Sequence, residues 1–168
     1  MKHLRLPHDG LILRDVLLKT IIESNFGTRA EIKTLEAGCG RKWALNSVQR
    51  SFKITGVDLD NDAFEIRKKR FDDIESFHHM SLEDFKKPNT FDFLYCVDVL
   101  EHCTNTNTII NNLISSLKTD GLGIIAFPNK NSFFGRLTYH TPHWLHVQFY
   151  KIFYKQKNAG TKGFGPYK

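Results

Sequence analysis

The chain of 168 residues contains no apolar run close to the roughly 20 residues that a membrane-spanning helix needs. It has only three cysteines, Cys39, Cys96 and Cys103, and none of them forms a CxxC pair, so neither a disulfide framework nor a cysteine-rich zinc site is expected. Near the N-terminus, Arg14 and Asp15 interrupt the apolar stretch that a signal peptide would require. These absences predict a cytoplasmic protein with free, buried thiols.

Acidic residues are absent after Asp120. The following segment carries seven of the 24 basic residues and 11 of the 21 aromatic ones, whereas the first 120 residues hold 17 basic against 18 acidic residues, a net charge of −1. Apolar content of 40% and charged content of 25% are ordinary for a globular domain. A nearly neutral body is therefore followed by a basic, aromatic tail.

Apolar periodicity predicts helices and strands that alternate along most of the chain. The expected helices are 11–24, 41–51, 61–74, 106–117 and 143–154, and the expected strands are 32–37, 53–57, 77–80, 91–97 and 122–127. This alternation predicts an α/β fold, a Rossmann-like and mainly parallel sheet of about five strands with helices on both faces. We expect residues 1–128 to form this domain and 129–168 to be a C-terminal segment of it or a remnant.

A glycine turn follows the first predicted strand, in the segment 34–40, TLEAGCG. Gly38 and Gly40 would let the backbone approach a ligand closely. The second strand ends on Asp58, whose carboxylate can accept hydrogen bonds from both hydroxyls of a ribose. The arrangement predicts a bound nucleoside.

The turn lacks the third glycine of a dinucleotide fingerprint, because Trp43 stands in its place. This difference disfavours a pyrophosphate site and an NAD(P)-dependent dehydrogenase. Glu36 would repel a pyrophosphate but attract an ammonium group, which favours a cationic nucleoside that carries an amino acid.

Together with two further segments, FDFLYCVDVLEH at 91–102 and LKTDGLGIIAF at 117–127, these motifs resemble the class I S-adenosylmethionine-dependent methyltransferases of the methyltransferase type 11 kind. The four blocks occur in the family's order and cover about residues 34–129. The resemblance implies S-adenosyl-L-methionine as the cofactor. Members of the family usually add two more strands, and the 40 residues after position 128 show no convincing pair, so the chain is expected to be shortened at its C-terminus.

Carried over position by position, the resemblance implies eight cofactor-binding residues: Glu36, Gly38, Gly40, Asp58, Leu59, Leu82, Glu83 and Val97. Glu36 and the glycines would surround the methionine and ribose, Asp58 would bind the ribose hydroxyls, and Leu59 and Leu82 would contact adenine, with Glu83 beside it. Val97 would line the pocket floor. Plainer alternatives stay open: Glu36 as a solvated strand-end acid, Asp58 as a helix cap, and Leu82 and Val97 as core residues.

The sulfonium methyl of this cofactor is already activated, so the protein chiefly aligns the acceptor and excludes water. A hydroxyl acceptor would also need a base, for which His102 and His143 are the candidates, although His102 also suits helix capping or turn packing. The resemblance implies methyl transfer to an unidentified small-molecule or lipid-like acceptor, and the alternative is a non-catalytic cofactor-binding remnant.

The tail leaves three interpretations open. In the first, following strands are missing and the aromatic residues of the tail are an uncovered core. In the second, the basic helix of the tail contacts a membrane surface. Nucleic acid is disfavoured because no RNA-binding motif accompanies the charge. Pro142 interrupts the histidine-rich segment 140–146, so no metal site is expected.

Overall fold

The computed structural model describes residues 11–41, 45, 48, 50–127 and 142, without the side chains of 11–15. The chain divides into two compact units, residues 1–97 with 105–125 and residues 98–104 with 126–168. The first unit carries the sheet. The predicted helix 143–154 and His143 lie outside the described residues.

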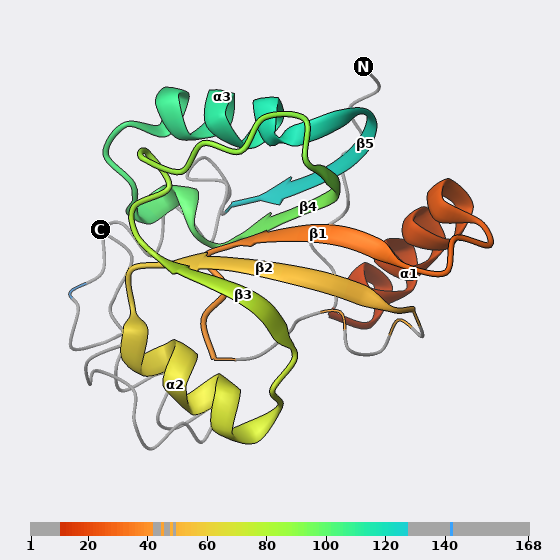
Figure 1. Ribbon diagram of the computed structural model, residues 1–168, viewed down its shortest axis with the longest axis horizontal. Coiled ribbons are helices and arrows are strands. Elements are labelled where there is room, and N and C mark those ends of the chain that lie inside the picture. Colours follow the sequence, from red (N-terminus) through yellow and green to blue (C-terminus); the bar gives the residue numbers. More distant parts are fainter. Residues whose placement is uncertain (1–10, 42–44, 46–47, 49, 128–141, 143–168) are drawn as a thin grey trace. The chain divides into compact units, whose positions relative to one another are not determined.

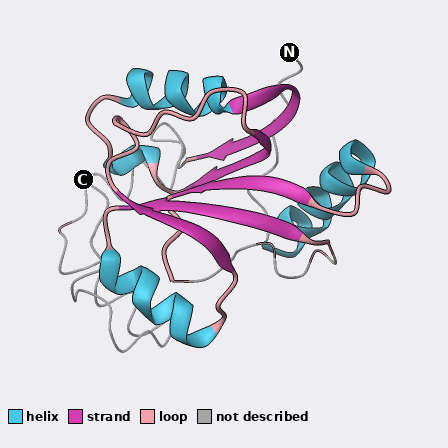
Figure 2. Ribbon diagram, viewed as in Figure 1, coloured by secondary structure: helices cyan, strands magenta, loops and turns pink. Residues whose placement is uncertain are grey.

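A five-stranded parallel sheet forms the centre of the first unit (Figures 1 and 2). Its strands follow the order β3-β2-β1-β4-β5: β3 (Ile74–His79), β2 (Phe52–Asp58), β1 (Ile32–Ala37), β4 (Phe91–Val97) and β5 (Leu117–Ala126). β1 pairs in parallel with both β2 and β4, and β2 pairs in parallel with β3. The predicted Rossmann-like fold class is confirmed.

Three α-helices accompany the sheet: α1 (Leu11–Phe26), α2 (Asn61–Arg70) and α3 (Thr106–Ser116). The crossover from β2 to β3 and the crossover from β4 to β5 run in opposite directions across the sheet. Right-handed connections therefore place α2 and α3 on opposite faces, as Figure 1 shows. A short 3₁₀ helix, η1 (Leu100–His102), belongs to the second unit.

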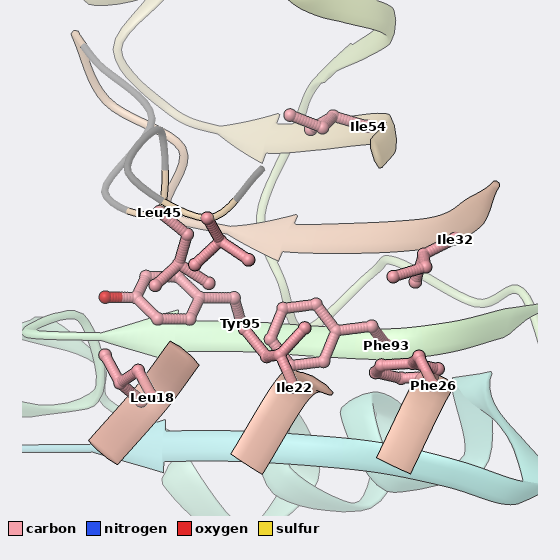
Figure 3. Close-up of a cluster of buried hydrophobic side chains, with 9 residues drawn as sticks. Leu18, Ile22, Phe26, Ile32, Leu45, Ile54, Phe93 and Tyr95 are labelled. Atoms are coloured by element: carbon pink, nitrogen blue, oxygen red, sulfur yellow. The ribbon is translucent and has the colours of Figure 1, made fainter. Parts of the chain in front are cut away.

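The core between α1 and the sheet is aromatic and aliphatic. Leu18, Ile22 and Phe26 recur every four residues on one side of α1 and face Phe93 and Tyr95 of β4 (Figure 3). The rings of Phe26 and Phe93 meet edge to face, with centroids 6.0 Å apart. Leu94 and Cys96, which alternate with Phe93 and Tyr95 and so point to the other face of β4, are also buried. Burial of both faces explains why this strand is apolar almost throughout.

Three predicted elements differ from the observed ones. Within 41–51, the described residues are 41, 45, 48, 50 and 51; the first four lie in turns or bends, and none of the five is helical. The helix expected to reach residue 74 ends at Arg70, since Asp72 adopts a left-handed φ of 46°, and β3 starts at Ile74, which pairs with Ile54. Residues 118–121, which lie between the predicted helix 106–117 and the predicted strand 122–127, belong to β5, because a place beside β4 outweighs the turn preference of Asp120-Gly121.

Candidate functional site

The glycine turn and the end of β2 lie side by side at the carboxyl edge of the sheet. Ala37, the last residue of β1, pairs with Val57, so the turn that follows β1 meets Asp58 directly. In open parallel sheets this edge is where ligands bind. The predicted proximity of the turn and Asp58 therefore follows from the parallel register.

The turn depends on glycine for its conformation. Gly38 and Gly40 have φ values of 70° and 53°, in the left-handed region where a side chain is strained. The Gly38 amide donates to the Val57 carbonyl at 2.8 Å, and the Gly40 amide donates to Oδ2 of Asp58 at 2.8 Å. These bonds tie the turn to β2.

Asp58 accepts a second backbone hydrogen bond, from the Asp60 amide to Oδ1 at 2.9 Å. A carboxylate oxygen has two lone pairs, so each oxygen of Asp58 retains one acceptor site for a ribose hydroxyl. Asp60, and not Asp58, caps α2, because its Oδ1 accepts from the Ala63 amide at 2.9 Å. The capping alternative for Asp58 is thus wrong.

Leu59 follows Asp58 and leaves 69% of its surface exposed. Its carbonyl lies 3.0 Å from Nε2 of His79, at the end of the neighbouring strand β3. An exposed apolar side chain beside a carboxylate offers a surface on which a flat base can pack. Its predicted adenine contact stays a prediction.

Glu36 is buried, with only 3% of its surface exposed, so it is not a solvated strand-end acid. Its Oε2 lies 2.8 Å from Nη1 of Arg67, but no hydrogen bond of good geometry reaches that oxygen from the described residues. Burial raises the pKa of Glu36 to about 8, against the opposing charge of Arg67. The predicted contact with the methionine part of a ligand would have to form at the edge of this buried group.

Arg67 is the functional candidate that the sequence did not reveal. It opens a run of four basic residues at the end of α2, a pattern typical of a solvated surface, yet its side chain is fully buried. Its Nε and Nη2 donate to the two carboxylate oxygens of Asp73 at 2.8 and 2.7 Å, and its Nη1 donates to the Cys39 carbonyl at 2.7 Å.

Gly56 provides space beneath the turn. A Cβ at this position would lie 2.9 Å from Sγ of Cys39 and 3.0 Å from Cδ1 of Ile74, closer than such atoms approach. The sequence signal for this close contact was a glycine inside a predicted strand, because such a glycine often marks the close approach of another part of the chain. Burial, followed by the charges of Glu36 and Asp58, raises the pKa of the Cys39 thiol to about 12, as expected for an inert thiol.

The sequence prediction of buried cysteines is confirmed in part. Cys39 and Cys96 are buried, and Cys103 is partly buried.

Leu82 and Glu83 are held by α3. The side-chain amide of Asn112 donates to the carbonyls of Leu82 and Glu83, at 3.2 and 2.7 Å, and the Asn105 side chain donates to Oε2 of Glu83 at 2.9 Å. Leu82 is buried, and Val97 packs against the core at the end of β4, which suits the core alternative for both.

Neither candidate base belongs to the described part of the first unit. His102 lies in η1 of the second unit, where its amide donates to the Val99 carbonyl at 3.0 Å. His143 falls outside the described residues.

The described part of the chain contains no group of three His, Cys, Asp or Glu side chains arranged to hold a metal. No helix among the described residues combines the length and hydropathy that crossing a membrane requires.

The sequence profile of a family described as a methyltransferase domain matches residues 13–157. Among curated proteins, "Ubiquinone biosynthesis O-methyltransferase" from Glaesserella parasuis serovar 5 is 30% identical over 110 residues, which cover 60% of this chain and 47% of that protein. The protein of the same name from Rickettsia canadensis is 25% identical over 125 residues, 70% of this chain and 53% of the relative. The chain thus spans about half the length of the curated relatives it matches.

Solved structures share the fold at low identity. PH0226 from Pyrococcus horikoshii OT3 is 18% identical with a TM-score of 0.55, covering 78% of this chain and 61% of that one. The N-methyltransferase NodS from Bradyrhizobium japonicum, solved with S-adenosyl-L-homocysteine, is 19% identical with a TM-score of 0.50, covering 66% of this chain and 59% of its own.

Proposed function

The chain belongs to the class I S-adenosylmethionine-dependent methyltransferase family, and on this basis we propose that it binds S-adenosyl-L-methionine at the glycine turn and transfers its methyl group to an oxygen acceptor. The observation that carries the proposal is the hydrogen bond of 2.8 Å between the Gly40 amide and Asp58. It joins a left-handed glycine turn to a carboxylate at the carboxyl edge of a parallel sheet, the combination that suits a ribose.

The charges around the turn fit a cationic cofactor. Glu36 and Asp73 surround the buried Arg67, and Asp58 adds a carboxylate that is not paired with a basic side chain among the described residues. A sulfonium and an ammonium group would meet a site of negative or neutral character, whereas a pyrophosphate would meet repulsion. The exposed Leu59 beside Asp58 adds an apolar surface for the base.

Each residue would bind or orient, because the bound cofactor itself supplies an activated methyl group. Asp58 would hold the ribose hydroxyls, and the backbone of Gly38 and Gly40 would allow close approach. Glu36 would accept a hydrogen bond from the methionine ammonium at the edge of its buried carboxyl group. Leu59 would support adenine, with Leu82 and Glu83 nearby and Val97 at the pocket floor.

We assign the acceptor to the class of hydroxylated small molecules or lipid-like compounds. The support is the name of the curated relatives, which act as O-methyltransferases in ubiquinone biosynthesis. An oxygen acceptor must lose its proton when the methyl is transferred, and His102 or His143 would take that proton. The basic, aromatic tail would contact a membrane surface if the acceptor is a lipid.

Isothermal titration with S-adenosyl-L-homocysteine tests the cofactor assignment first. Saturable binding is expected, and heat signals no larger than those of diluting the ligand into buffer would refute it. A radiolabelled methyl-transfer assay with catechols and hydroxylated quinone precursors then tests the activity, with glycine and other amines as controls for N-methylation.

A non-catalytic cofactor-binding remnant is the second candidate, because the hydrogen bonds around Asp58 support binding alone and assign no base for methyl transfer. Tight binding of S-adenosyl-L-homocysteine without methyl transfer to any acceptor would support this alternative. Methyl transfer to a single acceptor class would exclude it.

A further inference from the structure

One peptide group of the glycine turn is held from both sides by charged side chains. The carbonyl of the Cys39–Gly40 peptide accepts from Nη1 of Arg67 at 2.7 Å, and the amide of the same peptide donates to Oδ2 of Asp58 at 2.8 Å. Because the peptide is planar, its carbonyl and amide point in opposite directions. Arg67 therefore holds the peptide from the core while Asp58 holds it from the edge of the sheet.

We infer that Arg67 is a positioning residue of the cofactor site, which fixes the plane of the Cys39–Gly40 peptide and, through it, the carboxylate of Asp58. The inference rests on the proposed function, since it assigns this role at the site where the cofactor is proposed to bind. Arg67 itself is fully buried and is not expected to touch the cofactor.

The other contacts of Arg67 aim its guanidinium at the turn. Asp73 accepts from Nε and Nη2, in the two-pronged geometry that suits a carboxylate and a guanidinium. This leaves Nη1 directed at the Cys39 carbonyl, with Oε2 of Glu36 at 2.8 Å. One side chain of α2 thus connects the end of β1, the glycine turn and the residue that precedes β3.

The turn needs such a restraint because glycine imposes little of its own. Gly38 and Gly40 flank Cys39, and glycine adopts positive and negative φ values with similar ease. Rotation of the peptide by half a turn would direct its carbonyl at the Asp58 carboxylate and remove the Gly40 hydrogen bond. A charged donor on the carbonyl disfavours that conformer, because leaving a buried guanidinium without its acceptor is costly.

Stability alone explains Arg67 poorly. Moving the guanidinium of Arg67 and the carboxyl group of Glu36 out of water costs free energy that their attraction only roughly offsets, and well-packed apolar residues often replace buried ion pairs without loss. A positioning role predicts a different pattern, in which ligand affinity depends on Arg67 more than folding does.

The affinity test compares three variants with the wild-type protein by titration with S-adenosyl-L-homocysteine. Arg67→Met keeps the volume and removes every donor, and it should weaken binding by about tenfold or more, the effect of losing one charge-assisted hydrogen bond. Arg67→Lys keeps the charge but not the forked pair of donors, and a partial rescue to a roughly threefold loss of affinity is expected.

Asp92→Asn is the matched control. Asp92 accepts hydrogen bonds from Arg29, Lys118 and the Lys33 amide at the amino edge of the sheet. This variant should lower the melting temperature and leave the affinity unchanged.

The Gly40 amide gives a direct readout of the peptide's orientation. In ¹H–¹⁵N spectra, its resonance should move upfield and its hydrogen exchange should accelerate in Arg67→Met and in Asp58→Asn. The double variant should show little further change, since both side chains hold the same peptide.

The inference is overturned if Arg67→Lys, or a folded Arg67→Met, binds S-adenosyl-L-homocysteine as tightly as the wild type and keeps the wild-type Gly40 resonance. If Arg67→Met does not fold, Arg67→Lys decides the question against Asp92→Asn. A wild-type protein that fails to bind S-adenosyl-L-homocysteine refutes the proposed function instead, and the Gly40 amide still reports whether Arg67 fixes the peptide.

Discussion

At the scale of single residues, Asp58 has more than one role. It accepts hydrogen bonds from the amides of Gly40 and Asp60, so it stabilises both the glycine turn and the short connection from β2 to α2. The same carboxylate is proposed to bind ribose. Replacing it should therefore affect the ligand directly and the turn indirectly.

We expect Asp58→Ala to weaken binding of S-adenosyl-L-homocysteine by about 1.5–3 kcal/mol, the scale of lost charge-assisted hydrogen bonds. Calorimetric titration measures the change. Asp62→Ala, which removes an exposed acid from the first turn of α2, is the matched control and should bind like the wild type. Unchanged affinity in Asp58→Ala would show that the ribose site lies elsewhere.

Glu36 makes stability depend on pH. Burial raises its pKa from 4.5 to about 8, with Arg67 opposing the rise. Between these two pKa values, folded chains keep a proton on Glu36 that unfolded chains lose. The contribution of Glu36 to the free energy of unfolding is therefore fully present below about pH 4.5 and is lost as the pH rises through about 8.

The expected result is a free energy of unfolding that falls between pH 5 and pH 8 more steeply in the wild type than in Glu36→Gln, where no proton is lost. Urea denaturation at pH 5, 6.5 and 8 measures both. Glu65→Gln, an exposed acid of α2, serves as the control. Parallel curves for the wild type and Glu36→Gln would contradict the assignment.

At the scale of elements, the fit between β2 and the turn after β1 decides where the backbone of the site lies. Gly56 leaves the space that the buried side chain of Cys39 fills. The glycine is thus required by a neighbour 17 positions away and not by its own backbone angles.

Gly56→Ala should lower the free energy of unfolding by about 1–3 kcal/mol, the usual cost of overpacking a core. The double variant Cys39→Ala/Gly56→Ala should recover much of this loss, because removing Sγ vacates the space that the new methyl group needs. Thermal or urea denaturation of the four proteins gives the coupling. Additive losses would mean that Cys39 is not the obstacle.

At the scale of the whole molecule, the chain contains the sheet and the turn but spans about half of its curated relatives. Every residue of the Gly40, Asp58 and Arg67 arrangement belongs to one compact unit. Cofactor binding and folding of this unit should therefore be coupled.

Saturating S-adenosyl-L-homocysteine should raise the free energy of unfolding by about 2.7 kcal/mol at a ligand concentration of 100 times Kd. Differential scanning calorimetry over a concentration series measures the shift, with adenosine as the control ligand. A melting temperature that does not respond to the ligand would contradict cofactor binding by the folded unit.

Local patterns along the chain were sufficient to predict the fold class, the bounds of β1 and β4, and the proximity of the glycine turn to Asp58. They could do so because apolar strands have a local pattern and because the carboxyl ends of parallel neighbours always meet at one edge. The residue types at that edge also predict a cationic nucleoside, which stays a prediction.

The surroundings of Glu36 and the burial of Arg67 became visible only in the folded structure. Arg67 stands 31 positions from Glu36 and 28 from Cys39, in a basic run whose local pattern indicates solvent. The burial and ion pairing of Arg67 arise because α2 places it beside Glu36 of β1 and beside the glycine turn, an arrangement for which periodicity carries no signal. The same reason explains why the contact of Gly56 with Cys39 became visible only in three dimensions.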